Sequence, residues 1–154
     1  MKKFINITCA ALLLFLFSCD KLPENGELDG QWQLMQIEEF SENSQDPSSV
    51  ASKKESRIYW AFQLDLLSIH TQLEALNGHT TYTVGRFQHH GGRLDLPEFY
   101  IHFHNRDSLL TDPTTQVLNF TGIRGNKASF KVEKLNSKSM ILSSDFNRLT
   151  FRKF

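Results

Sequence analysis

Short runs in which apolar and polar residues alternate, separated by turn-forming residues, constrain the fold of this chain more than any other feature. The clearest run lies in the segment 57–71, where apolar side chains occupy every second position: Ile58, Trp60, Phe62, Leu64 and Leu66. Because successive side chains of a strand point to opposite faces, this period of two places all five on one face. The pattern predicts a strand over residues 57–71 that directs those side chains into the core.

The same stretch also fits a second pattern. Apolar residues recur at spacings of four and three, as on one face of an amphipathic helix: Phe62, Leu66, Ile69, Leu73 and Leu76. We favour a strand for 57–71 because the alternation is sharp and because aromatic residues, which strands prefer, cluster there. Residues 72–78 could form a helical turn, so 57–76 stays open between one strand, two strands and a partly helical segment.

The Gly91-Gly92 pair predicts a two-residue hairpin turn, because both turn positions need a positive φ. The turn would join a strand at 79–90 to a strand at 93–104 and place His90 opposite Arg93. Both flanking runs contain aromatic residues and alternate in polarity over part of their length. An antiparallel hairpin is therefore expected in the middle of the chain.

The remaining pattern extends the hairpin into a single sheet. Pro97, together with a change of apolar phase between Leu96 and Phe99, predicts a bulge in the hairpin's second strand. Further strands are predicted at 31–40, 116–123, 127–135, 138–143 and 146–154, with loops at 41–56 and 105–115 and tight turns at 125–126 and 136–137. The sequence thus predicts an all-β fold, a single antiparallel meander of about eight strands. Closure into a barrel is favoured because it leaves no exposed strand edge.

The N-terminal residues have the features of an export signal. Lys2 and Lys3 precede an apolar run from Ile5 to Phe17, which is shorter than the roughly 20 residues needed to span a bilayer. The run ends in Leu16-Phe17-Ser18-Cys19, which resembles the lipobox of bacterial lipoproteins; an ordinary secretory leader is the alternative. The resemblance implies cleavage after Ser18, acyl chains such as palmitate on Cys19, and a lipid-anchored protein of the outer membrane, on either of its faces.

This interpretation divides the chain into a signal peptide at 1–18, a short polar tether at 19–28 and one domain at 29–154. Cys9 would leave with the leader and Cys19 would be acylated, so no disulfide is expected and the domain depends on packing alone. Without Lys2 and Lys3, fifteen basic residues face seventeen acidic ones, a formal net charge of −2. That balance gives no reason to expect nucleic-acid binding.

Three segments of the domain resemble a known family. Gly30-Gln31-Trp32 resembles the G-x-W motif at the start of the first lipocalin strand. The segment 58–67 and the tail, 130–144 with 149–154, look like strands of the lipocalin-like lipoproteins common in Bacteroidetes. The resemblance covers most of 29–154 and implies a small barrel whose base is closed by Trp32. It also implies an arginine of the last strand, Arg152 or Arg148, as a cation–π partner of Trp32.

No catalytic constellation is evident. The sequence has no G-x-S-x-G motif, its acidic residues are scattered, and the cysteine of the mature chain would be acylated, so we do not expect an enzyme. Extending the hairpin register places His79 opposite His104, with His102 two residues away, and three such imidazoles could bind zinc. Solvent-facing histidines on a polar strand face are the favoured interpretation, so neither a metal nor a cofactor is predicted.

Two functions remain. In the first, the barrel binds a small hydrophobic ligand against an aromatic wall, for which five residues are the candidates: Trp60, Phe62, Phe87, Phe99 and Phe103. In the second, the aromatic side chains fill the core and the protein is an accessory lipoprotein that binds another envelope protein through its loops. A barrel of eight strands is the size at which both are feasible. The fold resemblance favours the ligand.

Overall fold

The computed structural model describes residues 24–41, 46–72, 82–103 and 106–154, and for residues 102 and 103 it describes the backbone alone. The described chain is built from strands and three short 3-10 helices. The strands are β1 (Gly30–Phe40), β2 (Pro47–Ser52), β3 (Ile58–Gln63), β4 (Leu66–Thr71), β5 (Tyr82–His90), β6 (Arg93–Phe103), β7 (Arg106–Leu109), β8 (Ala128–Leu135), β9 (Ser139–Ser143) and β10 (Asn147–Lys153). The 3-10 helices are η2 (Gly26–Leu28), η3 (Lys54–Ser56) and η5 (Asn119–Thr121).

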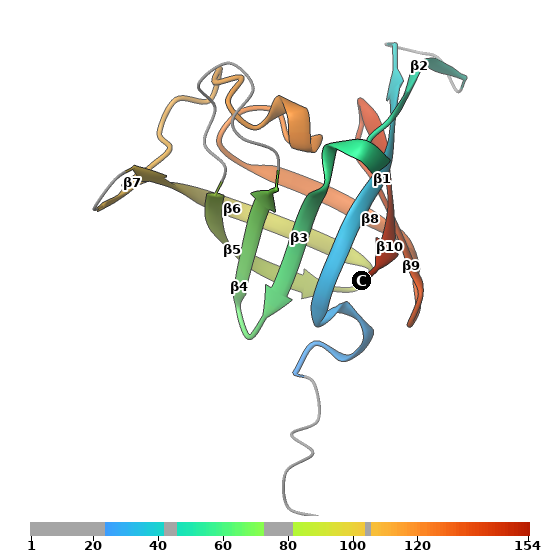
Figure 1. Ribbon diagram of the computed structural model, residues 1–154, viewed down its shortest axis with the longest axis horizontal. Helices are drawn as coiled ribbons and strands as arrows, with labels where there is room; N and C mark the ends of the chain where they lie inside the picture. Colours follow the sequence, from blue (N-terminus) through green and yellow to red (C-terminus); the bar gives the residue numbers. More distant parts are fainter. Residues whose placement is uncertain (1–23, 42–45, 73–81, 104–105) are drawn as a thin grey trace, which may run out of the picture.

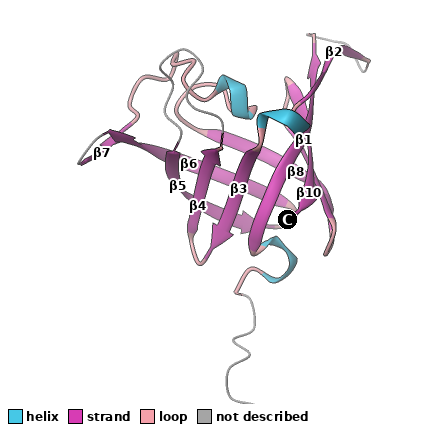
Figure 2. Ribbon diagram, viewed as in Figure 1, coloured by secondary structure: helices cyan, strands magenta, loops and turns pink. Residues whose placement is uncertain are grey.

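Eight of these strands form a closed antiparallel ring. Its order is β1, β3, β4, β5, β6, β8, β9, β10 and back to β1, and the ring is visible in Figures 1 and 2. The closing ladder runs from the pair Trp32–Lys153 to the pair Glu39–Asn147. The predicted all-β, eight-stranded barrel is therefore confirmed, and the three C-terminal strands fall within one residue of their predicted bounds.

The other two strands, β2 and β7, lie outside the ring. They arise because β1 and β6, with eleven residues each, are longer than their neighbours. β1 pairs with β3 at its start and with β2 beyond it, and β6 pairs in the same way first with β8 and then with β7. The prediction of loops throughout 41–56 and 105–115 is wrong in these parts. Every residue of β2 and β7 is exposed, so neither strand carries the alternation that would reveal it.

Of the alternatives left open for 57–76, two strands form, and the favoured single strand over 57–71 is wrong, because the chain turns at Leu64 and Asp65. Leu64 has a φ of 56°, and the turn joins β3 to β4 as a tight hairpin in which Gln63 pairs with Leu66. Leu64 and Leu66 are 51% and 42% exposed instead of pointing inward. After the turn the inward positions shift by one residue, to Leu67 and Ile69.

The predicted strand at 116–123 is a compact turn region around η5. Leu118 and Ile123 are fully buried against the barrel core, which explains the apolar pattern that suggested a strand. Gly122, with a φ of 91°, ends η5, and its carbonyl accepts a hydrogen bond of 2.8 Å from Nδ2 of Asn147 at the start of β10. The segment packs on one end of the barrel as a plug, above β8 in Figure 1.

The central hairpin forms as predicted. Gly91 and Gly92 have φ values of 57° and 78°, and His90 pairs with Arg93. The register between β5 and β6 shifts between Arg86 and Gln88, opposite Pro97, which confirms the predicted bulge.

Candidate functional site

The base of the barrel is closed by the Trp32 ring, which is fully buried. Its indole N–H donates a hydrogen bond of 2.8 Å to the Leu28 carbonyl, and the Lys153 ammonium lies 4.5 Å from the ring centroid. The same ammonium donates hydrogen bonds to the carbonyls of Glu27 and Asp29. Burial lowers the pKa of Lys153, because the charged form loses hydration there.

The cation over Trp32 is therefore Lys153, and the prediction of Arg152 is wrong by one residue. Side chains of β10 alternate, so Lys153 shares the inner face with buried Phe151 while Arg152 points outward. There Arg152 donates a hydrogen bond of 2.9 Å to Oε1 of Gln33. The alternative, Arg148, also lies on the outer face, where it pairs with Glu38 and Glu133.

The aromatic wall predicted inside the barrel is present. Trp60 and Phe62 of β3, Phe87 of β5 and Phe99 of β6 are all at most 5% exposed. The side chain of Phe103, the fifth candidate, lies outside the described residues. The four described rings confirm the inward face assigned from the alternation.

These rings contact one another and leave little room at their level. The Trp60 ring centroid lies 5.1 Å from that of Phe151, 6.0 Å from Phe130 and 6.3 Å from Phe62. Phe62 in turn meets Phe87 edge to face at 5.1 Å. Phe130 of β8 and Phe151 of β10, which are outside the five predicted wall residues, complete the cluster because closure of the barrel brings them to Trp60.

One atom of this cluster lacks a partner. The indole N–H of Trp60 is the only buried side-chain polar group of the described chain with no hydrogen-bond acceptor. A buried donor without an acceptor costs about 1–3 kcal/mol. An acceptor supplied by a bound molecule would recover that free energy. A hydrogen bond to this N–H would therefore favour binding of a ligand in the interior.

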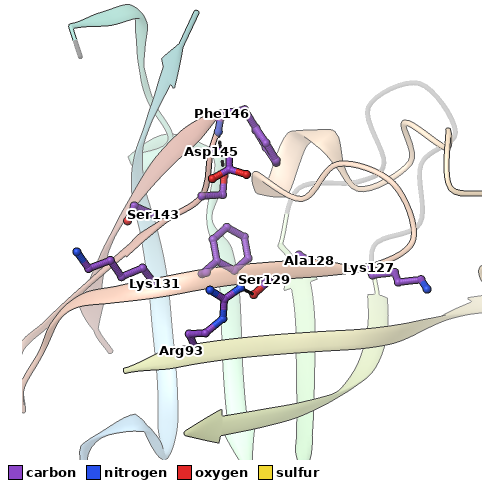
Figure 3. A pocket seen from close by; sticks show the side chains of 10 residues that line it. Arg93, Lys127, Ala128, Ser129, Lys131, Ser143, Asp145 and Phe146 are labelled. Carbon is purple, nitrogen blue, oxygen red and sulfur yellow. Dashed lines mark hydrogen bonds between the residues drawn. The ribbon is translucent and has the colours of Figure 1, made fainter. Parts of the chain in front are cut away.

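A cleft in the barrel wall lies close to this cluster. β9 pairs with β8 only from Lys131 onward, so the first residues of β8 and the turn between β9 and β10 stand apart. The resulting cleft has a volume of about 500 Å³. It is lined by Arg93, Lys127, Ala128, Ser129, Phe130, Lys131, Ser143, Ser144, Asp145 and Phe146 (Figure 3).

The Phe130 ring lies between the cleft and the interior. Its side chain lines the cleft, is fully buried, and meets the Trp60 ring edge to face. The Phe130 ring is therefore part of the lining of the cleft and also part of the group of rings around the Trp60 indole.

The histidines give no metal site in the part of the chain that the structure describes. His70 stacks on Tyr59 with ring centroids 5.3 Å apart, and burial lowers its pKa. His79, His104 and the side chain of His102 lie outside the described residues, so their predicted proximity stays a prediction. Among the residues that are described, no group of three metal-ligating side chains occurs and no helix has the length and apolar character to span a bilayer.

A closed eight-stranded antiparallel barrel with a buried tryptophan at its base defines a protein of the lipocalin type. The chain belongs to the lipocalin-like domain family, whose model matches residues 12–154. No curated protein matches the sequence.

Two solved structures are similar to the chain. A lipocalin-like protein from Bacteroides uniformis ATCC 8492 is 24% identical with a TM-score of 0.57, over 84% of this chain and 100% of that one. An uncharacterized protein from Bacteroides eggerthii DSM 20697 is 18% identical with a TM-score of 0.56, over 82% and 99%. At these identities the likeness supports the fold alone.

The base provides a direct stability test. Lys153→Ala should lower the free energy of unfolding by about 1–2 kcal/mol, because it removes the cation from the Trp32 ring and two charge-assisted hydrogen bonds. Arg152→Ala is the comparison on the outer face and should cost less, about 1 kcal/mol or below, because water can replace the guanidinium as donor to Gln33. Urea denaturation measures both, and an Arg152→Ala loss larger than that of Lys153→Ala would show that arginine is the cation that supports the base.

Proposed function

We propose that this protein is a lipid-anchored, non-catalytic lipoprotein of the outer membrane whose barrel binds a small hydrophobic ligand beside Trp60. The observation that carries the proposal is the buried Trp60 N–H without an acceptor. A ligand with one hydrogen-bond acceptor and an otherwise apolar body suits a site of this kind, since such pockets are mostly apolar with few polar anchors. Membership of the lipocalin-like family supports the same role.

The ligand needs space that the rings now occupy. Phe130 is the ring best placed to give way, because it separates the Trp60 cluster from the wall cleft. Rotation of Phe130 toward the cleft would open a path to the indole without disturbing the ladder between β1 and β10. We therefore propose that the ligand enters through the wall, between the start of β8 and the turn that follows β9.

A specific observation favours the second function, that of a filled-core lipoprotein which binds an envelope protein. Trp60 is in contact with three other rings, and β2 leaves the barrel with all six of its residues exposed. A strand that is exposed along its length offers its free edge to a strand of another protein. In that case the interior only stabilises the fold.

Tryptophan fluorescence separates the two functions. Fatty acids, envelope lipids and porphyrin-like compounds should shift or quench the emission saturably, because the ligand changes the surroundings of the Trp60 indole. The chain has two tryptophans, so Trp32→Phe should keep the response and Trp60→Phe should lose it. If no apolar compound changes the emission of Trp60, and crosslinking in cells captures an envelope protein on β2, the filled-core function replaces the proposed one.

The anchor is tested by Cys19→Ser. This change removes the thiol that accepts the acyl chains, so metabolic labelling with palmitate should disappear and the precursor should stay uncleaved. Ser18→Ala, which keeps a small residue before the cysteine, is the matched control and should still be labelled. Continued labelling of Cys19→Ser would contradict the lipoprotein assignment, and protease treatment of intact cells distinguishes the two faces of the outer membrane.

A further inference from the structure

We propose that the wall cleft is itself a binding site for an amphipathic anion, a molecule with a carboxylate or phosphate group on an apolar chain. This inference goes beyond the interior site and does not depend on it. The cleft keeps its charges and its apolar floor whether or not a ligand reaches Trp60.

The charge of the lining favours an anion. Arg93, Lys127 and Lys131 contribute three cations, against one lining carboxylate, Asp145. Among the described residues, neither lysine has a carboxylate oxygen within 4.0 Å, although Lys131 interacts electrostatically with Glu133, and Arg93 has a weak ion pair with Asp95 at 3.7 Å. The lining residues alone therefore carry two more positive than negative charges, three minus one.

The strand register strengthens this argument. Arg93 of β6 and Lys131 of β8 are direct cross-strand partners, and like charges at such positions repel each other. Arg93 donates a hydrogen bond of 2.6 Å to Oγ of Ser129, and that hydroxyl donates in turn to the carboxylate of Asp95, which offsets part of the charge of Arg93. An anion placed between the two cations would turn the repulsion into attraction on both sides.

The backbone adds a donor. The Val132 N–H bonds to the Gly92 carbonyl at 2.7 Å, so the N–H groups of Val132 and Phe130 point toward β6. The N–H of Ser129 therefore points the other way, toward the gap left where β9 does not pair with β8. A carboxylate or phosphate oxygen in the cleft can accept from it.

The floor favours an apolar chain over an inorganic anion. Phe130, Phe146 and Ala128 supply the apolar part of the lining. The Phe146 ring is half-buried, and the Arg124 guanidinium stacks on it with Cζ 4.3 Å from the centroid, which fixes the ring at the edge of the cleft. Figure 3 shows Phe146 on one side of the cleft and Arg93 with Lys131 on the other. A head group at the cations thus leaves its chain over aromatic surface.

Titration calorimetry on the purified protein tests the site with four probes: dodecanoate, dodecyl phosphate, dodecanol and inorganic phosphate. The two amphipathic anions should bind, each at least about tenfold more tightly than dodecanol. Dodecanol binds more weakly because its head group carries no charge and loses the charge-assisted hydrogen bond. Inorganic phosphate should bind at least about tenfold more weakly than dodecyl phosphate, because it has no chain to cover Phe146. Equal affinity for phosphate and dodecyl phosphate would overturn the amphipathic assignment.

Two double variants locate the site. Arg93→Gln with Lys131→Gln should weaken dodecanoate and dodecyl phosphate about tenfold and leave dodecanol unchanged. Lys134→Gln with Lys138→Gln removes two exposed lysines beyond the far end of the cleft and should change nothing. If dodecanoate binds both variants as tightly as the unchanged protein, the cleft is not its site. Titration of the Trp32→Phe protein with the same probes follows the emission of Trp60 alone and reports the interior, so either site can fail alone.

Discussion

The ladder between β1 and β10 is the interaction on which the rest of this structure depends. It joins the first strand to the last and leaves no free edge in the eight-stranded ring. A register shift between Leu34 and Gln36 lets β1 keep both Leu34 and Ile37 in the core. Closure also brings Phe151 onto Trp60 and Lys153 onto Trp32. The base and the aromatic cluster therefore both follow from one pairing.

The candidate sites lie where the ring is less complete. The first residues of β8, before Lys131, have no partner in β9, and the wall cleft lies in that gap. Behind it, the Trp60 N–H is buried without an acceptor. Elsewhere in the described chain the core is satisfied: the Asn147 amide bonds to Gly122, and the hydroxyl of Thr121 bonds to Leu118.

Much of the fold could be predicted because it is encoded locally. Alternation placed Trp60 and Phe62 inward, and Gly91-Gly92 specified the central hairpin. The errors arose where a local pattern has two meanings. Leu64 continues the alternation of β3 but adopts a positive φ and turns the chain, and the apolar residues around Leu118 pack as a plug instead of a strand. Features that depend on long-range register could not be predicted: the choice of Lys153 over Arg152, and the pairing of Arg93 with Lys131 beside the cleft.

The indole N–H signals provide the sharpest test of the proposal that a ligand binds in the interior beside Trp60. A proton–nitrogen correlation spectrum resolves both indoles, and Trp32 serves as an internal reference because its N–H is already bonded to the Leu28 carbonyl. On addition of an envelope lipid extract, the Trp60 signal should move downfield as its N–H gains an acceptor, while the Trp32 signal should stay in place. A Trp60 signal that does not move under saturating lipid, with its hydrogen exchange unchanged, would contradict the claim.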